Sequence, residues 1–426
     1  MNKKMSAILM IVVFLIGLGV GYEAKSIIAP PTTVGLSGEV KIGALEDRSG
    51  ALTTYGEEIK VAYDLAEKDV NAYLEAAGAG WWIKIIHEDT ASSPETALEK
   101  FESLAAKGIK IILGPMMSPA CSSVRDYAES HNILYISPSA TAVTLSIPGD
   151  NLFRFCAIDD LQGPAIGLMM ISSGVTHAVS AFVSNDWGIG LNKSAISKFV
   201  SLGGVAAQYI QWPGGTTDFT SIVESINTAV TDTYNSGVPL SEIGVFVASY
   251  REIISIFSLA SEYPLLKQVK WFGTDGTVMI PELVDLDEHP TETEFALATN
   301  FTSTMFKIPM GRTYKSVHDR IVEELGREPT IYAYSAYDSV WVVALALATV
   351  NEYDAMKVKA ILPKIADMYI GASGDILLNE NGDLAVADYS LWRPVRVNET
   401  CVKWMEVGVY HHETDTIEWK AGFSPA

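Results

Sequence analysis

Apolar and polar positions alternate in a regular way over residues 38–137. Short apolar runs that suit buried strands are separated by longer segments in which apolar residues recur at helical spacing, as at Ile59, Ala62, Ala66 and Val70. The predicted strands are Val40–Leu45, Trp81–Ile86, Ile109–Leu113 and Ile133–Ile136, and the predicted helices are Tyr55–Ala77, Pro94–Lys107 and Ala120–Ser130. Because strands that alternate with helices pair in parallel, this region predicts a parallel sheet covered by helices.

A second alternating set begins after an interruption at Asn151–Asp159. Its predicted strands are Ala178–Val183, Gly204–Ile210, Ile243–Ala248 and Val269–Phe272, with predicted helices at Gly190–Ser201, Phe219–Tyr234 and Glu252–Glu262. With 426 residues the chain exceeds one ordinary hydrophobic core, and two similar α/β units usually enclose a cleft. The pattern therefore predicts an α/β protein with two lobes.

The C-terminal part of the chain has a different pattern. Helices are predicted at Tyr314–Leu325 and Tyr334–Thr349, and the apolar run Val340–Val350 is too short to cross a membrane, so it predicts a buried helix. Asn379–Asp383 predicts a hairpin turn, because the segment lacks the glutamate that closes a calcium-binding loop. Short strands are predicted within Trp392–Trp419.

Residues 1–24 have the pattern of a targeting segment. Lys3 and Lys4 precede an unbroken apolar run, Ala7–Val20, whose length suits the core of a signal peptide. No clear cleavage site follows, so a cleaved signal and a short membrane anchor both stay open, and residues 25–37 are predicted to be a linker. Either interpretation places the body of the protein outside the cytoplasm and gives it membrane contact only through this segment.

Composition narrows the classes of partner. The chain is 48% hydrophobic and 19% charged, as expected for a well-packed protein, and its net charge of −21 argues against nucleic acid as a partner. Cys121, Cys156 and Cys401 have no metal-site spacing, and they allow one disulfide whose pairing the sequence does not specify. Asn192, Asn300 and Asn398 begin N-glycosylation sequons, which also arise often by chance.

Motifs of enzymes are not found. The chain has no G-x-S-x-G elbow, no phosphate-binding P-loop and no G-x-G-x-x-G after a strand. His87 and the pair His411–His412 lack the spacing of metal ligands, and no histidine pairs convincingly with a nucleophile. The sequence therefore predicts neither catalysis nor a metal or cofactor.

Polar groups instead gather where predicted strands end. Gly114–Ser118 and Ser137–Thr141 each follow a strand, at the edge where α/β sheets bind ligands and helix N-termini favour an anion. Ser118 and Thr141 are thus candidates to hold a carboxylate, although each also suits a helix cap. Asp275 follows another strand and is a candidate partner for a ligand ammonium, or an ordinary turn aspartate.

Tyr55, Trp187 and Tyr250 occupy similar positions after strands, where a large aromatic side chain can form the wall of a cleft or simply pack. With one candidate anion subsite and one candidate cation subsite, these residues together predict a receptor for a zwitterion.

Several short motifs also occur in an order and spacing that resemble a known family. They are Ile42–Ala44, Ser49–Gly50, Tyr55–Gly56, Gly114–Pro115 with Ser118, Ile136–Thr141, Phe153–Arg154 with Asp160, Gln162 and Gly163, and Asn381–Asp383. Over about Glu39 to Tyr410 the chain resembles the type 1 periplasmic binding proteins, and among them the branched-chain amino-acid (Leu/Ile/Val) receptors of ABC transporters.

The resemblance implies a fold of two Rossmann-like lobes with parallel sheets, joined by three hinge crossovers with the ligand closed between the lobes. The implied crossovers lie near Arg154–Ile158, near Ala298–Thr304 and within Leu377–Leu391. Lobe 1 would comprise residues 38–156 and 303–380, and lobe 2 residues 157–299 and 390–426.

The resemblance also implies roles for individual residues. Positions matching Ser118 and the segment Ser139, Ala140 and Thr141 hold the ligand α-carboxylate in the amino-acid receptors, and the position matching Asp275 holds the α-ammonium. Positions matching Tyr55, Met116, Met117, Trp187 and Tyr250 line the pocket. Leucine-type receptors carry glutamate in place of Asp275 and tyrosine in place of Trp187, and these two departures loosen the assignment of the ligand side chain.

The sequence and the resemblance together predict a substrate-binding protein that delivers a branched-chain or related amino acid to the membrane subunits of an ABC importer. Three alternatives stay open: an amide or urea receptor of the same fold, a ligand-sensing subunit of a signalling complex, and an enzyme.

Overall fold

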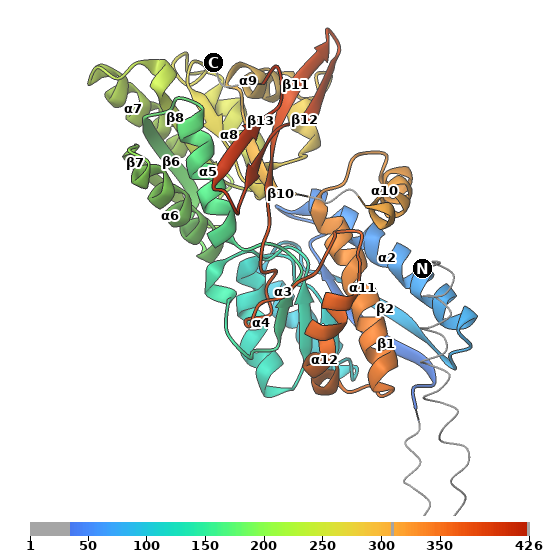
Figure 1. The fold of residues 1–426 in the computed structure, drawn as a ribbon. Coiled ribbons are helices and arrows are strands. Elements are labelled where there is room, and N and C mark those ends of the chain that lie inside the picture. Colours follow the sequence, from blue (N-terminus) through green and yellow to red (C-terminus); the bar gives the residue numbers. More distant parts are fainter. Residues whose placement is uncertain (1–34, 308–310, 424–426) are drawn as a thin grey trace, which may run out of the picture. The chain divides into compact units, whose positions relative to one another are not determined.

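The structure is a computed structural model that describes residues 35–307 and 311–423. The predicted targeting segment and most of the predicted linker lie outside the described residues. Two parallel sheets, each covered by helices, and one antiparallel sheet make up the described chain (Figure 1). The α/β fold class with two parallel sheets is therefore confirmed.

The first sheet has the strand order β2-β1-β3-β4-β5, and all of its pairs are parallel. Its strands are β1 (Gly38–Glu46), β2 (Trp81–Asp89), β3 (Ile111–Leu113), β4 (Leu134–Ser137) and β5 (Leu152–Arg154). The helices that accompany it are α2 (Thr53–Ala76), α3 (Pro94–Ala106), α4 (Ser118–Ser130), α10 (Arg312–Leu325), α11 (Ile331–Val350) and α12 (Ala355–Met368).

The apolar run of the C-terminal part is a buried helix, as predicted. It belongs to α11, the one described helix whose length and apolar composition would suit a membrane span. Of the most apolar 18-residue stretch of this helix, 72% is buried inside the protein. The helix packs along α2 and α12. Burial against protein accounts for its hydrophobicity.

The second sheet has the order β7-β6-β8-β9 and is also parallel. Its strands are β6 (His177–Val183), β7 (Val205–Trp212), β8 (Ile243–Ala248) and β9 (Lys270–Phe272). Its helices are α5 (Asp159–Ser172), α6 (Asp186–Ser201), α7 (Thr220–Asn235), α8 (Ile253–Ala260) and α9 (Pro290–Ala298). Short 3-10 turns lie at η2 (Leu240–Glu242), η3 (Asp275–Thr277) and η4 (Pro281–Val284), and a further one, η1 (Val143–Leu145), lies between β4 and β5 of the first sheet.

Helix α5 was not predicted, because its sequence lacks an apolar stripe. Ile166, Met169 and Met170 are all fully buried, so the helix is apolar on more than one face. Gly163 and Gly167 lie against α6, and a Cβ atom at either glycine would come within 2.8 Å of that helix. The absence of side chains at these two positions allows α5 and α6 to pack closely.

The antiparallel sheet was predicted only in outline. It has the order β10-β11-β12-β13, and the region predicted as short strands contains strands of 10 and 11 residues. Its strands are β10 (Ser303–Phe306), β11 (Tyr389–Asn398), β12 (Cys401–His411) and β13 (Thr416–Trp419). Helices α9 and α12 and strand β5 were likewise missed. The predicted lobe boundaries stay a prediction.

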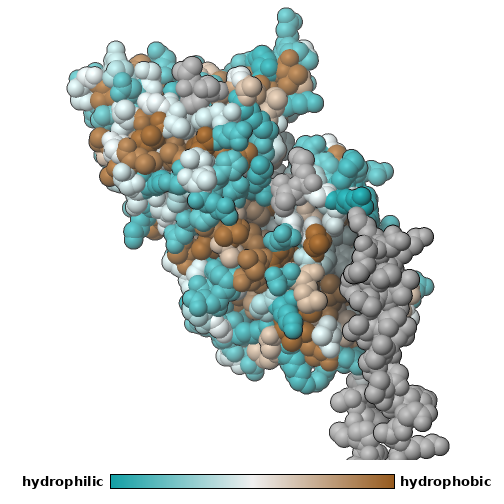
Figure 2. Space-filling model, in the orientation of Figure 1, coloured by the Kyte–Doolittle hydropathy of each residue, from teal (hydrophilic) through white to brown (hydrophobic). Residues whose placement is uncertain are grey.

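On the face drawn in Figure 2, hydrophobic residues form separate groups between hydrophilic ones. Within the described chain, Met368 and Ile370 are the most exposed large apolar side chains, at 71% and 73%. Cys121, Cys156 and Cys401 are all free thiols, so the disulfide that the sequence allowed is not formed.

Candidate functional site

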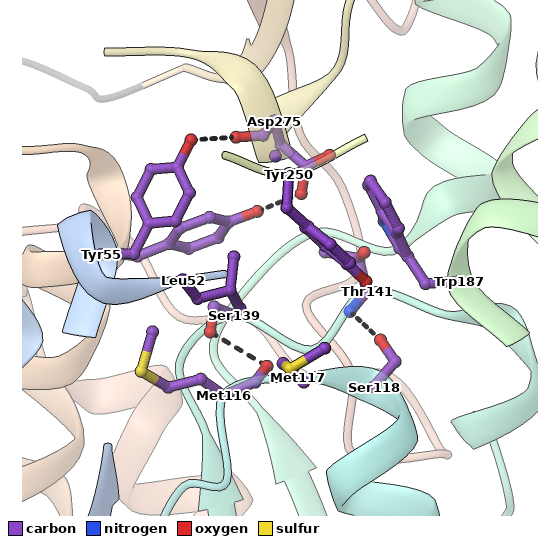
Figure 3. A pocket seen from close by; sticks show the side chains of 12 residues that line it. Leu52, Tyr55, Met116, Met117, Ser118, Ser139, Thr141, Trp187, Tyr250 and Asp275 are labelled. Atoms are coloured by element: carbon purple, nitrogen blue, oxygen red, sulfur yellow. Dashed lines mark hydrogen bonds between the residues drawn. The ribbon is translucent and has the colours of Figure 1, made fainter. Parts of the chain in front are cut away.

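A pocket lies where loops of the first and second sheets meet (Figure 3). The empty space within it, including solvent open at its mouth, is about 350 Å³. Its walls come from the start of α2, the loops that follow β3, β4 and β8, the start of α6, η3 and the start of α11. The lining residues are Leu52, Tyr55, Met116, Met117, Ser118, Ser139, Thr141, Trp187, Tyr250, Asp275, Gly276 and Tyr332.

Nine of the ten residues predicted to bind a ligand line this pocket, and Ala140 does not. The side chain of Ala140 is fully buried, and its carbonyl accepts hydrogen bonds from Arg154 and Cys156. Leu52, Gly276 and Tyr332 were missed, because a leucine, a glycine and a helical tyrosine carry no sequence signal that separates lining from core. Ligand binding by any of these residues stays a prediction.

Ser118 is positioned at the start of α4 as a hydrogen-bond donor to the pocket. Its Oγ accepts the main-chain N–H groups of Thr141 at 3.2 Å and Ala142 at 3.1 Å. Because these contacts occupy the oxygen as an acceptor, the hydroxyl proton is left to donate elsewhere. Helix α4 also begins without a side-chain cap, and its N-terminal end carries a partial positive charge. This end of the pocket suits an anion.

The loop after β4 contributes hydroxyl groups to the pocket, but its main-chain donors are already used. Ser137 Oγ donates to the Pro115 carbonyl at 2.7 Å and accepts the N–H groups of Ala140 at 3.0 Å and Ser139 at 3.4 Å. The Thr141 N–H is bound to Ser118. The expected main-chain donors of this loop therefore hold the loop itself. The Ser118 hydroxyl remains for a ligand, and the Thr141 hydroxyl also acts on the carboxyl group of Asp159.

Asp275 provides the opposite charge. It lies in η3, is only 6% exposed, and its Oδ2 accepts a 2.5 Å hydrogen bond from the Tyr332 hydroxyl. Its Oδ1 is buried and has no hydrogen-bond partner among the described residues. Burial raises the pKa of Asp275, and the Tyr332 hydroxyl opposes that rise. A buried carboxylate oxygen without a donor is costly, so this position suits a ligand cation.

The remaining walls are apolar and aromatic. The rings of Trp187 and Tyr250 stack with centroids 4.5 Å apart, and they close on Gly276, where a Cβ atom would lie 3.0 Å from Trp187 and 3.2 Å from Tyr250. Met116 and Met117 lie on the opposite side in Figure 3. The lining contains no lysine, arginine or histidine.

Tyr55 connects the two sides of the pocket directly. Its hydroxyl, on α2, lies within hydrogen-bond distance of the main-chain carbonyls of Val278 at 2.8 Å and Asp275 at 3.1 Å. The Tyr55 ring also meets Tyr332 edge-on at 6.3 Å. Two tyrosines beside the first sheet thus reach the turn that carries Asp275.

A buried ion pair fixes the loop behind the pocket. Arg154 and Asp383 are 0% and 1% exposed, and Arg154 Nε donates to Asp383 Oδ1 at 2.6 Å. Arg154 Nη1 also donates to the carbonyl of Ala142 at 2.7 Å, and Nη2 donates to Ser146. The hairpin turn predicted from the sequence contains Gly382 and Asp383, and it places the Asp383 carboxylate beside Arg154.

Metal-binding and catalytic clusters were sought as well. Over residues 35–307 and 311–423, no group of three or more His, Cys, Asp or Glu side chains is placed to hold a metal ion. His87 lies in ion pairs with Glu46 and Asp64, and His411 with Asp388 and Glu418. These contacts give both histidines a structural role.

Comparison with known proteins agrees with this geometry. A family model described as periplasmic binding protein matches residues 39–397. An uncharacterized protein of Methanocaldococcus jannaschii is 29% identical over 404 residues, which cover 89% of this chain and 92% of that protein. The leucine-, isoleucine-, valine-, threonine- and alanine-binding protein of Pseudomonas aeruginosa is 23% identical over 381 residues, 87% of this chain and 92% of its own length.

Solved structures share the fold at low sequence identity. A leucine-binding protein of Thermotoga maritima matches with a TM-score of 0.70 and 20% identity, over 86% of this chain and 97% of that one. A solute-binding protein of an R. palustris ABC transporter, in complex with 4-hydroxybenzoate, also matches at 0.70, with 16% identity over 86% of this chain and 96% of that one. One fold therefore serves ligands that share a carboxylate but differ in the rest of the molecule.

Proposed function

Because this chain belongs to the periplasmic binding protein family, we propose that it is an extracytoplasmic receptor for an α-amino acid with an apolar side chain. The receptor would deliver the bound amino acid to the membrane subunits of an ABC importer. Members of the family and its structural neighbours are solute-binding proteins, which favours binding over catalysis.

The main observation in support is that the two ends of one pocket favour opposite charges. Ser118 and the N-terminal end of α4 favour an anion, and the unpartnered Oδ1 of Asp275 favours a cation. An α-amino acid carries both charges on one carbon atom and satisfies both ends together. Amides and urea lack the ammonium and would leave Asp275 without a cation.

The apolar walls support an apolar side chain on the ligand. Leu52, Met116, Met117 and the Trp187–Tyr250 stack offer hydrophobic contact and no cationic partner. A glutamate or aspartate ligand would bury a second carboxylate without compensation, which is unfavourable.

A second candidate is an aromatic carboxylate. The stacked rings of Trp187 and Tyr250 support it, since a flat aromatic ligand can pack against such a wall, and the R. palustris neighbour is a complex with 4-hydroxybenzoate. Such a ligand has no ammonium, however, and would leave Asp275 Oδ1 unpaired. Asp275 therefore favours the amino acid.

Closure of two lobes is the proposed mode of capture. The groups proposed for the carboxylate accompany the first sheet, and Asp275, Trp187 and Tyr250 accompany the second. A ligand that contacts both sets stabilises the closed arrangement, so binding shifts the population toward it. The transporter subunits would recognise that closed form.

The test is calorimetric titration of the purified protein with L-leucine, 4-hydroxybenzoate, acetamide and urea, preceded by mass spectrometry of any ligand retained after purification. Saturable binding of L-leucine or a related aliphatic amino acid, with no binding of acetamide or urea, supports the proposal. Binding of 4-hydroxybenzoate alone supports the second candidate. Binding of urea without any amino acid overturns both.

A further inference from the structure

A second buried carboxyl group lies just behind the pocket. Asp159, the first residue of α5, is 0% exposed, and both of its carboxylate oxygens lack a hydrogen-bond partner within the described part of the chain. Its main-chain N–H donates to the carbonyl of Thr141 at 2.9 Å, which ties it to a pocket-lining residue. Two buried oxygens without donors need an explanation beyond packing.

The neighbours of Asp159 do not neutralise it. Asp275 approaches from η3 and repels a negative charge on Asp159, as does Asp160 on its own helix. Arg154 on β5 attracts it, but that guanidinium is already bound to Asp383. Tyr250 and Tyr389 are the other titratable groups that face it, and both are neutral phenols at physiological pH.

The two acids differ in what holds their negative charge. Asp275 accepts a 2.5 Å hydrogen bond from Tyr332, whereas the Thr141 hydroxyl, which opposes the rise in the pKa of Asp159, makes no hydrogen bond of full geometry with either oxygen of Asp159. Burial and the nearby charge of Asp275 raise the pKa of Asp159 well above its usual value. These influences favour keeping a proton on Asp159 rather than on Asp275 when the site is free.

We propose that Asp159 and Asp275 form a two-carboxyl site that exchanges a proton for the ligand's ammonium group. The inference rests on the proposed function, because it requires an ammonium-bearing ligand. The ammonium brings one positive charge to a site that holds two carboxyl groups. Asp159 then ionises, and its proton passes to solvent buffer as the ligand is captured.

Proton exchange makes binding depend on pH. If one proton leaves for each ligand bound, Kd rises by up to tenfold for each unit by which the pH falls. An acid with its usual pKa would already be ionised near neutral pH and would release nothing. Ligand capture is then weaker in an acidic medium and stronger in a neutral one.

The experiment is titration with L-leucine at about pH 6 and 7.5, where the ligand's own groups keep their charges, in buffers of different ionisation enthalpy. The dependence of the binding heat on the buffer gives the number of protons released. We expect up to one proton for the native protein and none for Asp159→Asn, in which the pH dependence of Kd also disappears. The control is Asp287→Asn, since Asp287 is exposed and is not among the groups that act on Asp159; it should behave as native.

The outcomes separate the two proposals. If neither L-leucine nor another amino acid binds the native protein, the proposed function fails. If L-leucine binds without proton release, or if Asp159→Asn releases as many protons as the native protein, the two-carboxyl inference is overturned. Asparagine has the shape of a protonated aspartate, so Asp159→Asn should unfold at the native temperature or higher near neutral pH. A marked loss of stability would contradict a neutral Asp159.

Discussion

The buried ion pair Arg154–Asp383 and the site pair Asp159–Asp275 differ in kind, although Arg154 and Asp159 are near neighbours in the sequence. Arg154 is surrounded by acceptors, including Asp383 and the carbonyl of Ala142. Asp159 and Asp275 have three carboxylate oxygens without a partner. Burial alone therefore does not distinguish structural charge from functional charge.

The presence or absence of partners within the protein does distinguish structural from functional buried charges. A buried charge that is paired and hydrogen-bonded within the protein fixes local structure, as Arg154 fixes the loop that carries Thr141. A buried charge left unpaired is tolerated only if it is neutralised or meets a partner from outside. Under the proposed function, the difference marks the predicted ligand subsite, and it can be tested by removing one member of each pair.

The largest expected effect is on the Arg154–Asp383 ion pair. Replacing Arg154 by methionine leaves Asp383 buried without a cation, which should lower the free energy of unfolding by about 3–5 kcal/mol. Urea denaturation followed by circular dichroism measures the change. The double variant Arg154→Met with Asp383→Asn removes the orphaned charge and should recover much of the stability. Equal stability of the single and double variants would contradict the role of compensation.

The site pair should respond in the opposite way. Asp275→Asn removes the proposed ammonium partner, so amino-acid binding should weaken by about 2–4 kcal/mol while the fold is retained. Because burial opposes ionisation of Asp275, thermal stability without ligand should stay level or rise. The exposed Asp287→Asn is the matched control. Native affinity for amino acids in Asp275→Asn would refute the ammonium role.

Ser118→Ala tests the anion end and sharpens the contrast with Asp275. Loss of a buried donor to a carboxylate should weaken binding by about 1–3 kcal/mol, for amino acids and for aromatic carboxylates alike. Asp275→Asn should affect only the amino acids. Calorimetry with L-leucine and 4-hydroxybenzoate compares the two variants, with Ser130→Ala at the other end of the same helix as the control. A loss confined to one ligand class would place the carboxylate elsewhere.

The sequence predicted every strand of the two parallel sheets except β5, because short buried strands and amphipathic helices have distinct periods, although β2 and β7 continue two or three residues beyond their predicted ends. It did not predict α5, in which the buried face extends around the helix, nor the extent of the long antiparallel strands. The lining of the pocket followed from strand ends and from the family resemblance. Tyr332 could not be found, since its contact with Asp275 joins positions 57 residues apart in the chain.

The adjacent residues Asp159 and Asp160 also show what the sequence alone could not predict. Asp159 and Asp160 are adjacent, and the resemblance drew attention to Asp160, which is exposed. Only the packing of α5 shows that Asp159 faces inward beside Thr141. Likewise, the sequence placed hydroxyls near a ligand but could not show that the main-chain N–H groups of the same loop are already bound.

His87 is a third charged group that is paired within the protein, and its protonation depends on pH. It lies 2.5 Å from the fully buried Glu46 and 3.1 Å from Asp64, and although its burial opposes the charge, these two carboxylates raise its pKa to about 9. A raised histidine pKa stabilises the fold fully below pH about 6.5, and the contribution is lost as the pH rises through about 9. His87→Gln should therefore be less stable by about 1–3 kcal/mol at pH 6 and nearly equal to native at pH 10. A difference that does not change with pH would show that His87 is neutral.

The smallest expected effect separates the main chain of Asp275 from its carboxylate. The Tyr55 hydroxyl contacts the main-chain carbonyls of Asp275 and Val278 and so joins the two sides of the pocket. Removing this hydroxyl in Tyr55→Phe should destabilise the closed form by about 0.5–1.5 kcal/mol. The affinity for every ligand should then fall by a similar factor, and dissociation should become faster. Stopped-flow fluorescence with L-leucine and 4-hydroxybenzoate measures both rates. A loss specific to amino acids would mean that Tyr55 acts through the Asp275 carboxylate, whereas a uniform loss assigns it to closure and leaves ligand choice to the unpaired acids.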